Sequence, residues 1–469
     1  MSGFTTITDP DIIGGYLTDA SNTRGHAECL VIPRSTTEVA AVVAHCQQAR
    51  IPLTVTAQRT STTGGPVPRG GWLLSVEALD TVFASDEVGA GVILGQHQDR
   101  LEREGLFFPP DPTSRHECTV GAAIACNASG ARSFRYGPTR PWVEAVEVVL
   151  ADGEVVWASR ETPIPSSWPR IEWTEPRVKT AAGYFPTSNL LDLIIGSEGT
   201  LGVITRAKLK LIPQPGEILG LMVFFRAADD CVSFVETVRR GAGRRGVSAE
   251  PGALSPMAVE FFDHRALAMA TERIPDIPSE ARAALFVELS HDGEPPLEEW
   301  WEALTEAGAL AEDTIVADDA AGRRRLAAVR HAIPAGVNEA VVANGMPKVG
   351  TDFAVPDEAL REMMQAYNSI DLPAICFGHI GDNHLHLNLL PRTEDELTEA
   401  RTLYRSLALK AVSLGGTVSA EHGIGKIKSD LLAAMVDPET LAAFRALKAH
   451  VDPAWILGRG NMLAGPTSD

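Results

Sequence analysis

The chain has 469 residues, more than one ordinary hydrophobic core accommodates, so its length predicts two or three domains of roughly 100–200 residues each. With 45% hydrophobic and 22% charged residues, it has the composition of a fully globular protein. Its 61 acidic and 41 basic side chains give a net charge of −20, which would repel a phosphate backbone or an anionic membrane surface and argues against nucleic acid as a partner.

The cysteines and the N-terminus indicate in which cellular compartment the protein is expected. The six cysteines form no Cys-x-x-Cys pair and no ladder of short spacings, which argues against zinc ribbons and secreted disulfide scaffolds. The start MSGFTTITDPDIIGG has no basic region followed by an apolar run, and no segment approaches the roughly 20 apolar residues of a membrane span. We expect a cytoplasmic protein without a membrane span and consider a homodimer as its assembly.

The first part of the chain has the pattern of a βα unit followed by loops of small residues. Ser35 and Glu38 form a capping box at the start of a helical pattern, and a short strand follows at 51–56. Three loops rich in glycine and other small residues come next, at 60–71, 117–137 and 193–213. They are the first candidates for a ligand site.

The pattern changes after Pro213 and Pro215. Strand-like runs at 220–225, 285–290, 374–380 and 384–390 alternate with helix-like runs at 229–240, 297–308, 321–332, 357–367 and 394–413. This alternation predicts an antiparallel or mixed sheet with helices on one face. We therefore expect three parts: 1–215, a substrate or cap domain over 216–418, and a helical segment at 419–469 that packs back on the first part.

The glycine loops allow close approach of the backbone to a ligand, and successive N–H groups can hold a phosphate, although a single such loop is more often only a turn. Neither common nucleotide signature is present, because no Gly-x-Gly-x-x-Gly follows the first strand, and Gly425-Lys426 lacks the rest of a P-loop. A nucleotide site here would be of another type.

Five motifs in a fixed order resemble one family. They are 60-TSTTGGPVP-68, 109-PPDPTS-114, 119-TVGAAIACNASG-130 with Tyr136-Gly137, 146-VEVVLADGEVV-156 and 196-GSEGTLGVIT-205. Together they resemble the FAD-binding domain of the vanillyl-alcohol-oxidase type and, within it, the FAD-linked D-2-hydroxyacid dehydrogenases such as D-lactate, glycolate and D-2-hydroxyglutarate dehydrogenases. The resemblance runs from about residue 27 to 460 and implies an α+β fold with that FAD-binding domain and a substrate domain whose antiparallel sheet is covered by helices.

The resemblance also implies which residues would line FAD. Thr60, Ser61, Thr62, Thr63, Gly64 and Gly65 would wrap the pyrophosphate, and Asp111, Pro112 and Ser114 would line the flavin. Thr119, Gly121, Asn127, Gly130 and Gly137 would continue along the cofactor, and Glu198, Gly199 and Ile204 would close over the adenosine part. Two departures from the family pattern are 56-TAQR-59 before the first loop and 457-LGRGN-461 where Leu-Asn-Pro-Gly-Lys is common. Because Pro66 follows the glycine pair and no histidine is near in the sequence, we expect non-covalent FAD.

A histidine cluster, 378-GHIGDNHLHLNLL-390, is the second chemical signal. Alternation along a strand selects His384 and His386 with Asn388, since residues two apart share a face, although such histidines are often only structural. The resemblance selects differently and implies the ligands His379, His386 and Glu421 for a divalent metal, with zinc considered first. His384 stands where the family commonly has asparagine, so we expect it to be structural.

The remaining candidates concern the substrate. His422, beside Glu421, is the expected general base for the hydroxyl proton, because imidazole titrates near neutral pH. Arg330 stands where the family places an arginine that pairs with the substrate carboxylate, whereas Lys348 and Asn388 are expected polar contacts to the substrate. The implied reaction is oxidation of a D-2-hydroxy acid to the 2-oxo acid by hydride transfer to flavin N5, with a quinone, a cytochrome, an electron-transfer flavoprotein or oxygen as acceptor.

Two other classes remain open. One is a metal-independent FAD oxidase, or another flavoenzyme of the same fold, whose turnover a chelator would not affect. The other is a non-catalytic FAD electron-transfer subunit, which would show no flavin reduction by any 2-hydroxy acid. A metallohydrolase is least expected, because no His-Glu-x-x-His motif occurs.

Overall fold

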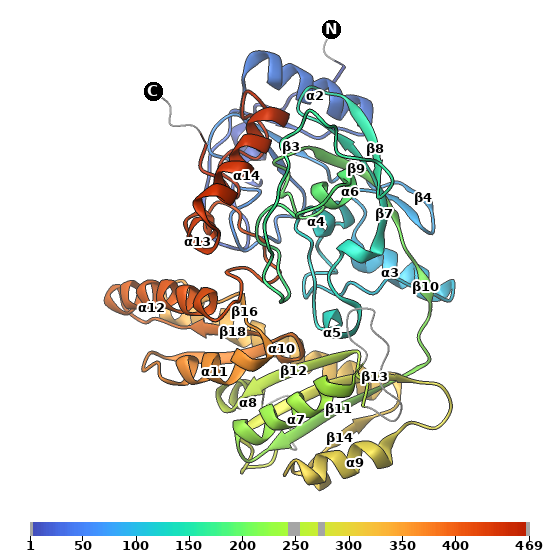
Figure 1. The fold of residues 1–469 in the computed structure, drawn as a ribbon, viewed down its shortest axis with the longest axis vertical. Coiled ribbons are helices and arrows are strands. Elements are labelled where there is room, and N and C mark those ends of the chain that lie inside the picture. Colours follow the sequence, from blue (N-terminus) through green and yellow to red (C-terminus); the bar gives the residue numbers. More distant parts are fainter. Residues whose placement is uncertain (1–2, 243–253, 271–276, 466–469) are drawn as a thin grey trace.

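The computed structural model describes residues 3–242, 254–270 and 277–465, and Figure 1 shows these residues arranged in two halves. In the upper half, a parallel three-stranded sheet has the order β1-β3-β2, with β1 at Cys29–Val31, β2 at Leu53–Thr56 and β3 at Trp72–Ser75. Helix α2 (Thr36–Ala49) connects the first two strands, and the Ser35 hydroxyl accepts a hydrogen bond from the Glu38 N–H, as the capping box predicts.

A second, antiparallel sheet of the upper half carries the loops that follow it. Its order is β4-β5-β9-β7-β8, with bounds Val82–Ala84, Glu87–Gly89, Val203–Leu209, Val143–Val149 and Val155–Ser159 in that order. A short pair joins β6 (Leu106–Phe107) to β10 (Ile212–Pro213). Helices α3 (Leu94–Arg103), α4 (Val120–Ala125), α5 (Ser133–Tyr136) and α6 (Leu190–Ile194) lie between these strands.

The lower half is built on one eight-stranded sheet. Its order is β14-β11-β13-β12-β17-β18-β15, and β16 also pairs with β18. The bounds are Ile315–Ala317 for β14, Glu217–Phe225 for β11, Ala283–His291 for β13, Ala258–Asp263 for β12, Ala374–His379 for β17, His384–Leu389 for β18, Val349–Gly350 for β15 and Phe353–Ala354 for β16. Every recorded strand pair in it is antiparallel, so the expected antiparallel sheet is confirmed.

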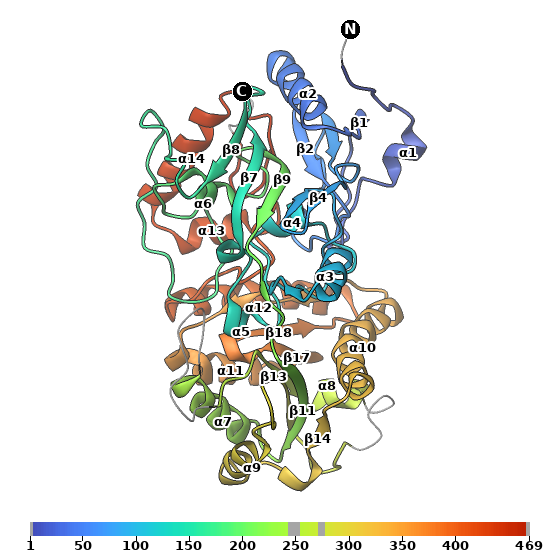
Figure 2. The same cartoon turned by 90° about the vertical axis from the view of Figure 1, so that its right-hand side faces the viewer.

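Helices cover both faces of this sheet, and the expectation of helices on one face is wrong. On β11, Leu221 and Val223 pack into the cluster that includes α7 (Ala228–Gly241) and α9 (Leu297–Glu306). The alternate residues Met222 and Phe224 pack instead with α8 (His264–Ala270) and α10 (Ala320–Asn344). Both sets of strand residues are apolar, which is the pattern of a sheet buried on two faces. Figure 2 shows α7 and α9 on one side of the sheet and α8 and α10 on the other.

The C-terminal part returns to the upper half. Helices α11 (Leu360–Asn368) and α12 (Glu394–Ser413) belong to the lower half, whereas α13 (Ser429–Met435) and α14 (Pro438–Val451) lie beside the first sheets (Figure 1). Phe444 of α14 packs edge-on against Tyr184, with ring centroids 5.3 Å apart. The division at 215/216 and 418/419 stays a prediction, which this path of the chain supports. Within the described residues, no helix combines the length and apolarity needed to cross a membrane.

Candidate active site

A tight hairpin brings the histidines of the 378–390 stretch onto one face of the eight-stranded sheet. His379 ends β17 and pairs directly with His384, the first residue of β18. The turn between them is one 3-10 turn at Ile380–Asp382, closed by Asn383 with a φ of 54°. Directly paired residues point to the same side of a sheet, and so do residues two apart. His379, His384 and His386 therefore share a face, even though His379 and His386 are an odd number of residues apart.

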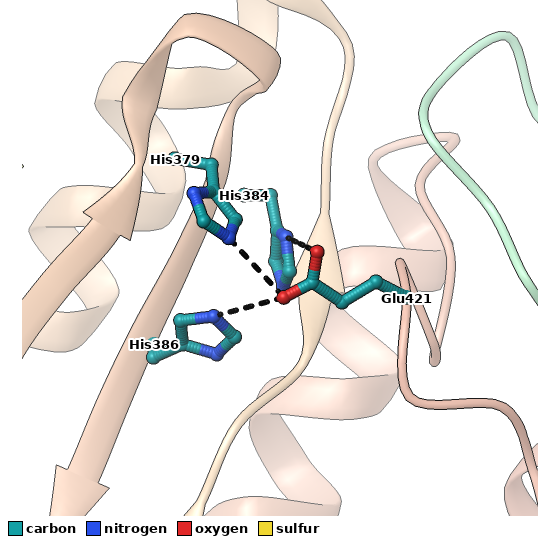
Figure 3. Close-up of side chains that lie close together, drawn as sticks. All are labelled: His379, His384, His386 and Glu421. Carbon is teal, nitrogen blue, oxygen red and sulfur yellow. Dashed lines mark hydrogen bonds and ion pairs between the residues drawn. The ribbon is translucent and has the colours of Figure 1, made fainter. Parts of the chain in front are cut away.

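Glu421 lies opposite these histidines, as Figure 3 shows. Its Oε1 is 3.2 Å from His379 Nε2 and 3.5 Å from His386 Nε2. In a tetrahedral zinc site with bonds of about 2.0–2.1 Å, ligand atoms lie about 3.4 Å apart. The three groups that the family resemblance implies as ligands are therefore together, at spacings that suit one small divalent ion.

The outward nitrogens of these two imidazoles are anchored. His379 Nδ1 is 2.5 Å from Glu260 Oε1, and His386 Nδ1 is 3.0 Å from the Thr351 carbonyl oxygen. An acceptor behind each ring holds the proton on Nδ1 and leaves the Nε2 lone pair directed at the common centre, which is the arrangement found behind metal-binding histidines. Burial opposes a charge on His379, but Glu260 and Glu421 outweigh it and raise its pKa to about 9, so these carboxylates favour a positive charge at the centre, which is a proton on the ring until an ion displaces it.

His384 belongs to the same cluster. It is fully buried, with Nε2 2.9 Å from Asp352 Oδ1 and Nδ1 3.9 Å from Glu421 Oε2, and neither ring nitrogen makes a well-aligned hydrogen bond. The ligand atoms of His379, His384, His386 and Glu421 all lie within 4.8 Å of one another. Asp352 lies beside His384, whose structural role stays a prediction, and the place of His384 on β18 puts it on the same face as His386, as alternation predicts.

The charges around the cluster also suit a divalent cation. Its contacts include four carboxylates: Glu260 and Glu421 pair with imidazoles of the cluster, Asp382 and Glu421 with Lys179, and Asp352 with His384 and Lys428. Two imidazole nitrogens and a carboxylate oxygen, with further carboxylates behind the rings, are a donor set and surroundings that divalent ions such as zinc prefer. The residues present therefore fit a metal ion.

Two residues that sequence reasoning missed hold the far oxygen of Glu421. Ser129 Oγ donates to Oε2 at 2.8 Å, and Lys179 Nζ donates to it at 3.0 Å. Both belong to the upper half and are distant from Glu421 in the chain. No local pattern around Lys179 signals this contact.

His422 lies at the open side of the cluster. Its side chain is 34% exposed, Nδ1 is 3.5 Å from Asp352 Oδ2, and its ring stacks on that of His386 with centroids 5.4 Å apart. Burial lowers the pKa of His422 to about 4 despite the nearby Asp352 and Glu421. The imidazole is thus neutral at pH 7, which a base requires, but it does not titrate near neutral pH as we expected from the sequence.

A cavity of about 620 Å³ separates the glycine loops from this cluster, and Glu421 and His422 line it. Of the residues expected at FAD, those that line this cavity are Thr60, Ser61, Thr62, Gly65, Pro112, Ser114, Gly121, Glu198, Gly199 and Ile204. Glu198 also joins the two sides of the site, because its carboxylate accepts hydrogen bonds from the Ile424 and Gly425 N–H groups, both at 2.7 Å.

The other residues expected at FAD do not line the cavity; they are Thr63, Gly64, Asp111, Thr119, Asn127, Gly130 and Gly137. Several shape the loops instead. Thr119 caps α4, Asn127 Oδ1 accepts from the Arg140 N–H at 2.9 Å, and a Cβ on Gly130 would meet the Asp111 carbonyl oxygen at 1.7 Å.

The two departures from the family pattern both lie at the cavity. Arg59 and Asn461 line it, and Arg59 has a φ of 61° with its guanidinium over the Tyr16 ring. Asn461 Nδ2 donates to the Glu198 carbonyl oxygen at 3.1 Å, and its Oδ1 accepts from Lys426 Nζ at 2.7 Å. The segment 457–461 thus supports the cavity wall by contacts of its own.

The three residues expected to contact the substrate lie in different parts of the lower half. Asn388 is 3% exposed on the histidine face, and its Nδ2 donates to the His386 carbonyl oxygen at 3.4 Å. Lys348 precedes β15, and desolvation lowers its pKa, although its side chain is exposed. Arg330 lies in α10, but its side chain is outside the described residues. Pro334, Ala335 and Asn338, one and two turns further along α10, line the cavity and were not expected.

Two known families match most of this chain. Residues 222–462 match the family described as FAD linked oxidases, C-terminal domain, and residues 27–159 match a family described as FAD binding domain. The histidines and Glu421 lie in the first match, and most of the glycine loops lie in the second.

Similar proteins cover almost the whole chain. A D-lactate dehydrogenase of Anaerostipes hadrus is 31% identical over 94% of this chain and 90% of its own length. The glycolate oxidase subunit GlcD of Bacillus subtilis is 30% identical over 93% and 89%, and a D-2-hydroxyglutarate dehydrogenase of Xanthomonas citri is 28% identical over 92% and 88%. A solved structure of alkyldihydroxyacetonephosphate synthase, 14% identical, has a TM-score of 0.67 over 97% of this chain and 81% of that one, and it shows the shared fold.

Proposed function

The chain belongs to the family of FAD-linked oxidases and is an FAD-linked oxidoreductase of the D-lactate, glycolate and D-2-hydroxyglutarate dehydrogenase type; from that premise, we propose that it oxidises a D-2-hydroxy acid to the 2-oxo acid with the help of a divalent metal ion. The observation that carries the proposal is the position of Glu421 and His422. They line the same cavity as the glycine loops, so a metal ligand and a base would both face the flavin site.

The two groups supply complementary chemistry when bound: FAD accepts the hydride from the substrate Cα at N5, and the ion polarises the substrate hydroxyl and carboxylate. His379, His386 and Glu421 would hold the ion, with zinc considered first because the donors are two nitrogens and one oxygen. Three protein ligands leave open positions for a chelating hydroxy acid.

His422 would accept the hydroxyl proton. It is neutral at pH 7, and Asp352 Oδ2 lies 3.5 Å behind its Nδ1, where a negative charge stabilises the imidazolium that forms. Asn388, Lys348 and Arg330 are the proposed contacts to the substrate carboxylate and side chain, with Arg330 suited to bidentate pairing.

We propose that FAD is held without a covalent bond. Cys118 and Cys126 line the cavity, and burial raises the pKa of Cys118 to about 11 and that of Cys126 to about 12. Both thiols therefore stay protonated at neutral pH and are poor nucleophiles. Acid precipitation is expected to release all the flavin into the supernatant, and yellow colour in the pellet would contradict this.

The decisive test is anaerobic titration of the FAD-loaded protein with a panel of D- and L-2-hydroxy acids while the flavin absorbance is followed. We expect bleaching by at least one D acid, its loss after treatment with a chelator, and its return when a divalent ion is added. Bleaching that a chelator does not affect would indicate a metal-independent flavoenzyme instead. Failure of every acid would favour an electron-transfer subunit. Quinones, cytochromes, electron-transfer flavoproteins and oxygen can then be compared as acceptors by reoxidation rate.

A further inference from the structure

The two carboxylate oxygens of Glu421 have different surroundings. Oε1 faces the Nε2 atoms of His379 and His386 (Figure 3). Oε2 instead accepts hydrogen bonds from Ser129 Oγ at 2.8 Å and from Lys179 Nζ at 3.0 Å. Hydrogen-bond donors therefore hold Oε2, which also lies 3.9 Å from His384 Nδ1, whereas Oε1 faces the Nε2 atoms of His379 and His386.

Lys179 is buried at this position. Its side chain is 1% exposed, and its ammonium group also donates to Ser133 Oγ at 3.2 Å and lies 4.0 Å from Asp382 Oδ2. An ammonium group is costly to bury unless it is paired, and a hydrogen bond between two charged groups is among the stronger ones. The contacts with the carboxylates thus account for the burial of the lysine.

The backbone around Lys179 is fastened to the segment that carries Glu421. The Ala181 N–H donates to the Ser419 carbonyl oxygen at 2.9 Å, and the hydroxyls of Thr180 and Thr417 lie 2.9 Å apart. This lysine comes from the connection between β8 and α6 in the upper half, whereas the imidazoles lie on the sheet of the lower half. Lys179 therefore reaches the cluster from the opposite half.

We propose that Lys179 is a positioning residue for the metal centre: together with Ser129, it holds Oε2 of Glu421 so that Oε1 alone is presented to the ion. The inference rests on the proposed function, because it presupposes a bound ion. A carboxylate that binds through one oxygen occupies one coordination position, so more positions remain for a substrate that binds through its hydroxyl and carboxylate.

The direction in which the metal affinity changes when Lys179 is removed separates a positioning role from a purely electrostatic one. Loss of an outer contact to a metal ligand typically lowers metal affinity about 10–100-fold. A lysine that acted only as a charge would repel the ion, so its removal would tighten binding. Substitution by methionine keeps much of the volume and removes the charge and the donor.

The test uses the full-length, FAD-loaded protein, stripped with a chelator and titrated with Zn²⁺ against a chromophoric chelator. We expect Lys179→Met to bind Zn²⁺ about 10–100-fold more weakly, with unchanged FAD content, and Ser129→Ala to shift in the same direction. Lys448→Met is the matched control, because Lys448 is a lysine with 2% exposure that is paired with Asp452 at 2.6 Å. It should lose some thermal stability but keep the wild-type Zn²⁺ affinity.

Each result decides between roles. Equal or tighter Zn²⁺ binding by Lys179→Met, with FAD retained, would overturn the inference and leave the proposed function intact. If Lys179→Met does not fold, Ser129→Ala decides, since an unchanged affinity there would contradict the joint holding of Oε2 by these two donors. A wild-type protein that binds neither Zn²⁺ nor Mn²⁺ would reject the metal part of the proposed function, and this inference with it.

Discussion

At the scale of single residues, the environment of each imidazole differs enough to separate their roles. His379 is enclosed between Glu260 and Glu421, and its pKa is raised to about 9, so it is a place for a positive charge. His422 is partly open, and its pKa is lowered to about 4 by burial, so it stays neutral. The carboxylates around His379 thus favour a positive charge there, whereas His422 stays neutral and able to accept a proton.

The role of His422 gives the first prediction. His422→Ala is expected to lower kcat/KM for the hydroxy acid about 10²–10⁴-fold, because a positioned general base contributes that much. FAD content and Zn²⁺ affinity should stay near the wild-type values, since its Nε2 lies 3.9 Å from Glu421 Oε1 and it is not among the proposed ligands. The measurement is steady-state turnover combined with flavin and metal content. Near-normal turnover would remove His422 from the mechanism.

At the scale of elements, sequence patterns and tertiary contacts were predictive to different degrees. The capping box at Ser35 and the helix 394–413 appear as expected, because their signals are local. His379 could not be selected by alternation, since the hairpin turn at 380–382 resets the phase between β17 and β18, and only the family resemblance nominated it. The two-sided helix cover of the large sheet was missed for a related reason: apolar alternation does not reveal which distant helices fill each face.

Contacts between remote loops were the least predictable. Lys179 and Glu421 are 242 residues apart in the chain, and nothing near either residue indicates the pairing. The need for glycine at position 425 is hidden from the local sequence in the same way. Gly425 follows Glu421 in an evident motif, but its need to be glycine arises from the loop at Thr63, which belongs to the other end of the sequence.

Gly425 therefore gives a prediction about an element. Its φ is +52°, and a Cβ there would lie 2.2 Å from the Thr63 carbonyl oxygen, so Gly425→Ala must displace the loop Thr60–Gly65. A residue with a side chain costs about 1–2 kcal/mol in this backbone region, and the clash adds to that. We expect a lower melting temperature and a reduced FAD content, measured from the ratio of flavin to protein absorbance.

Gly105→Ala is the matched control for this substitution. Gly105 has a φ of +73° but nothing within 4 Å of the added Cβ, so the variant has the backbone strain without the clash. It should lose stability of the order of 1–2 kcal/mol and keep its FAD. Equal FAD content in the two variants would show that the loop at Thr63 does not depend on Gly425.

At the scale of the whole molecule, the site depends on how the two halves meet. The glycine loops, Ser129 and Lys179 belong to the upper half, and the three histidines belong to the sheet of the lower half. A direct link between the halves is the ion pair of Arg132 with Glu288 on β13, in which Nε and one terminal nitrogen donate to the two carboxylate oxygens at 2.7 and 3.0 Å. The two side chains are 14% and 16% exposed, so this pair is largely shielded from water.

The last prediction follows from that shielding. Removing one partner leaves the other charge enclosed, so Arg132→Met is expected to cost about 2–5 kcal/mol of stability, whereas Arg226→Met, in the exposed pair with Glu280, should cost at most about 1 kcal/mol. Because the lost free energy comes from the ion pair, Arg132→Met combined with Glu288→Leu should be less destabilising than the sum of the single changes, as measured by denaturant unfolding of the FAD-loaded protein.

Loosening the contact between the halves would also separate Lys179 from the histidines, so Zn²⁺ affinity should fall in Arg132→Met but not in Arg226→Met. Strict additivity together with an unchanged Zn²⁺ affinity would mean that the halves are held in register by contacts other than this ion pair.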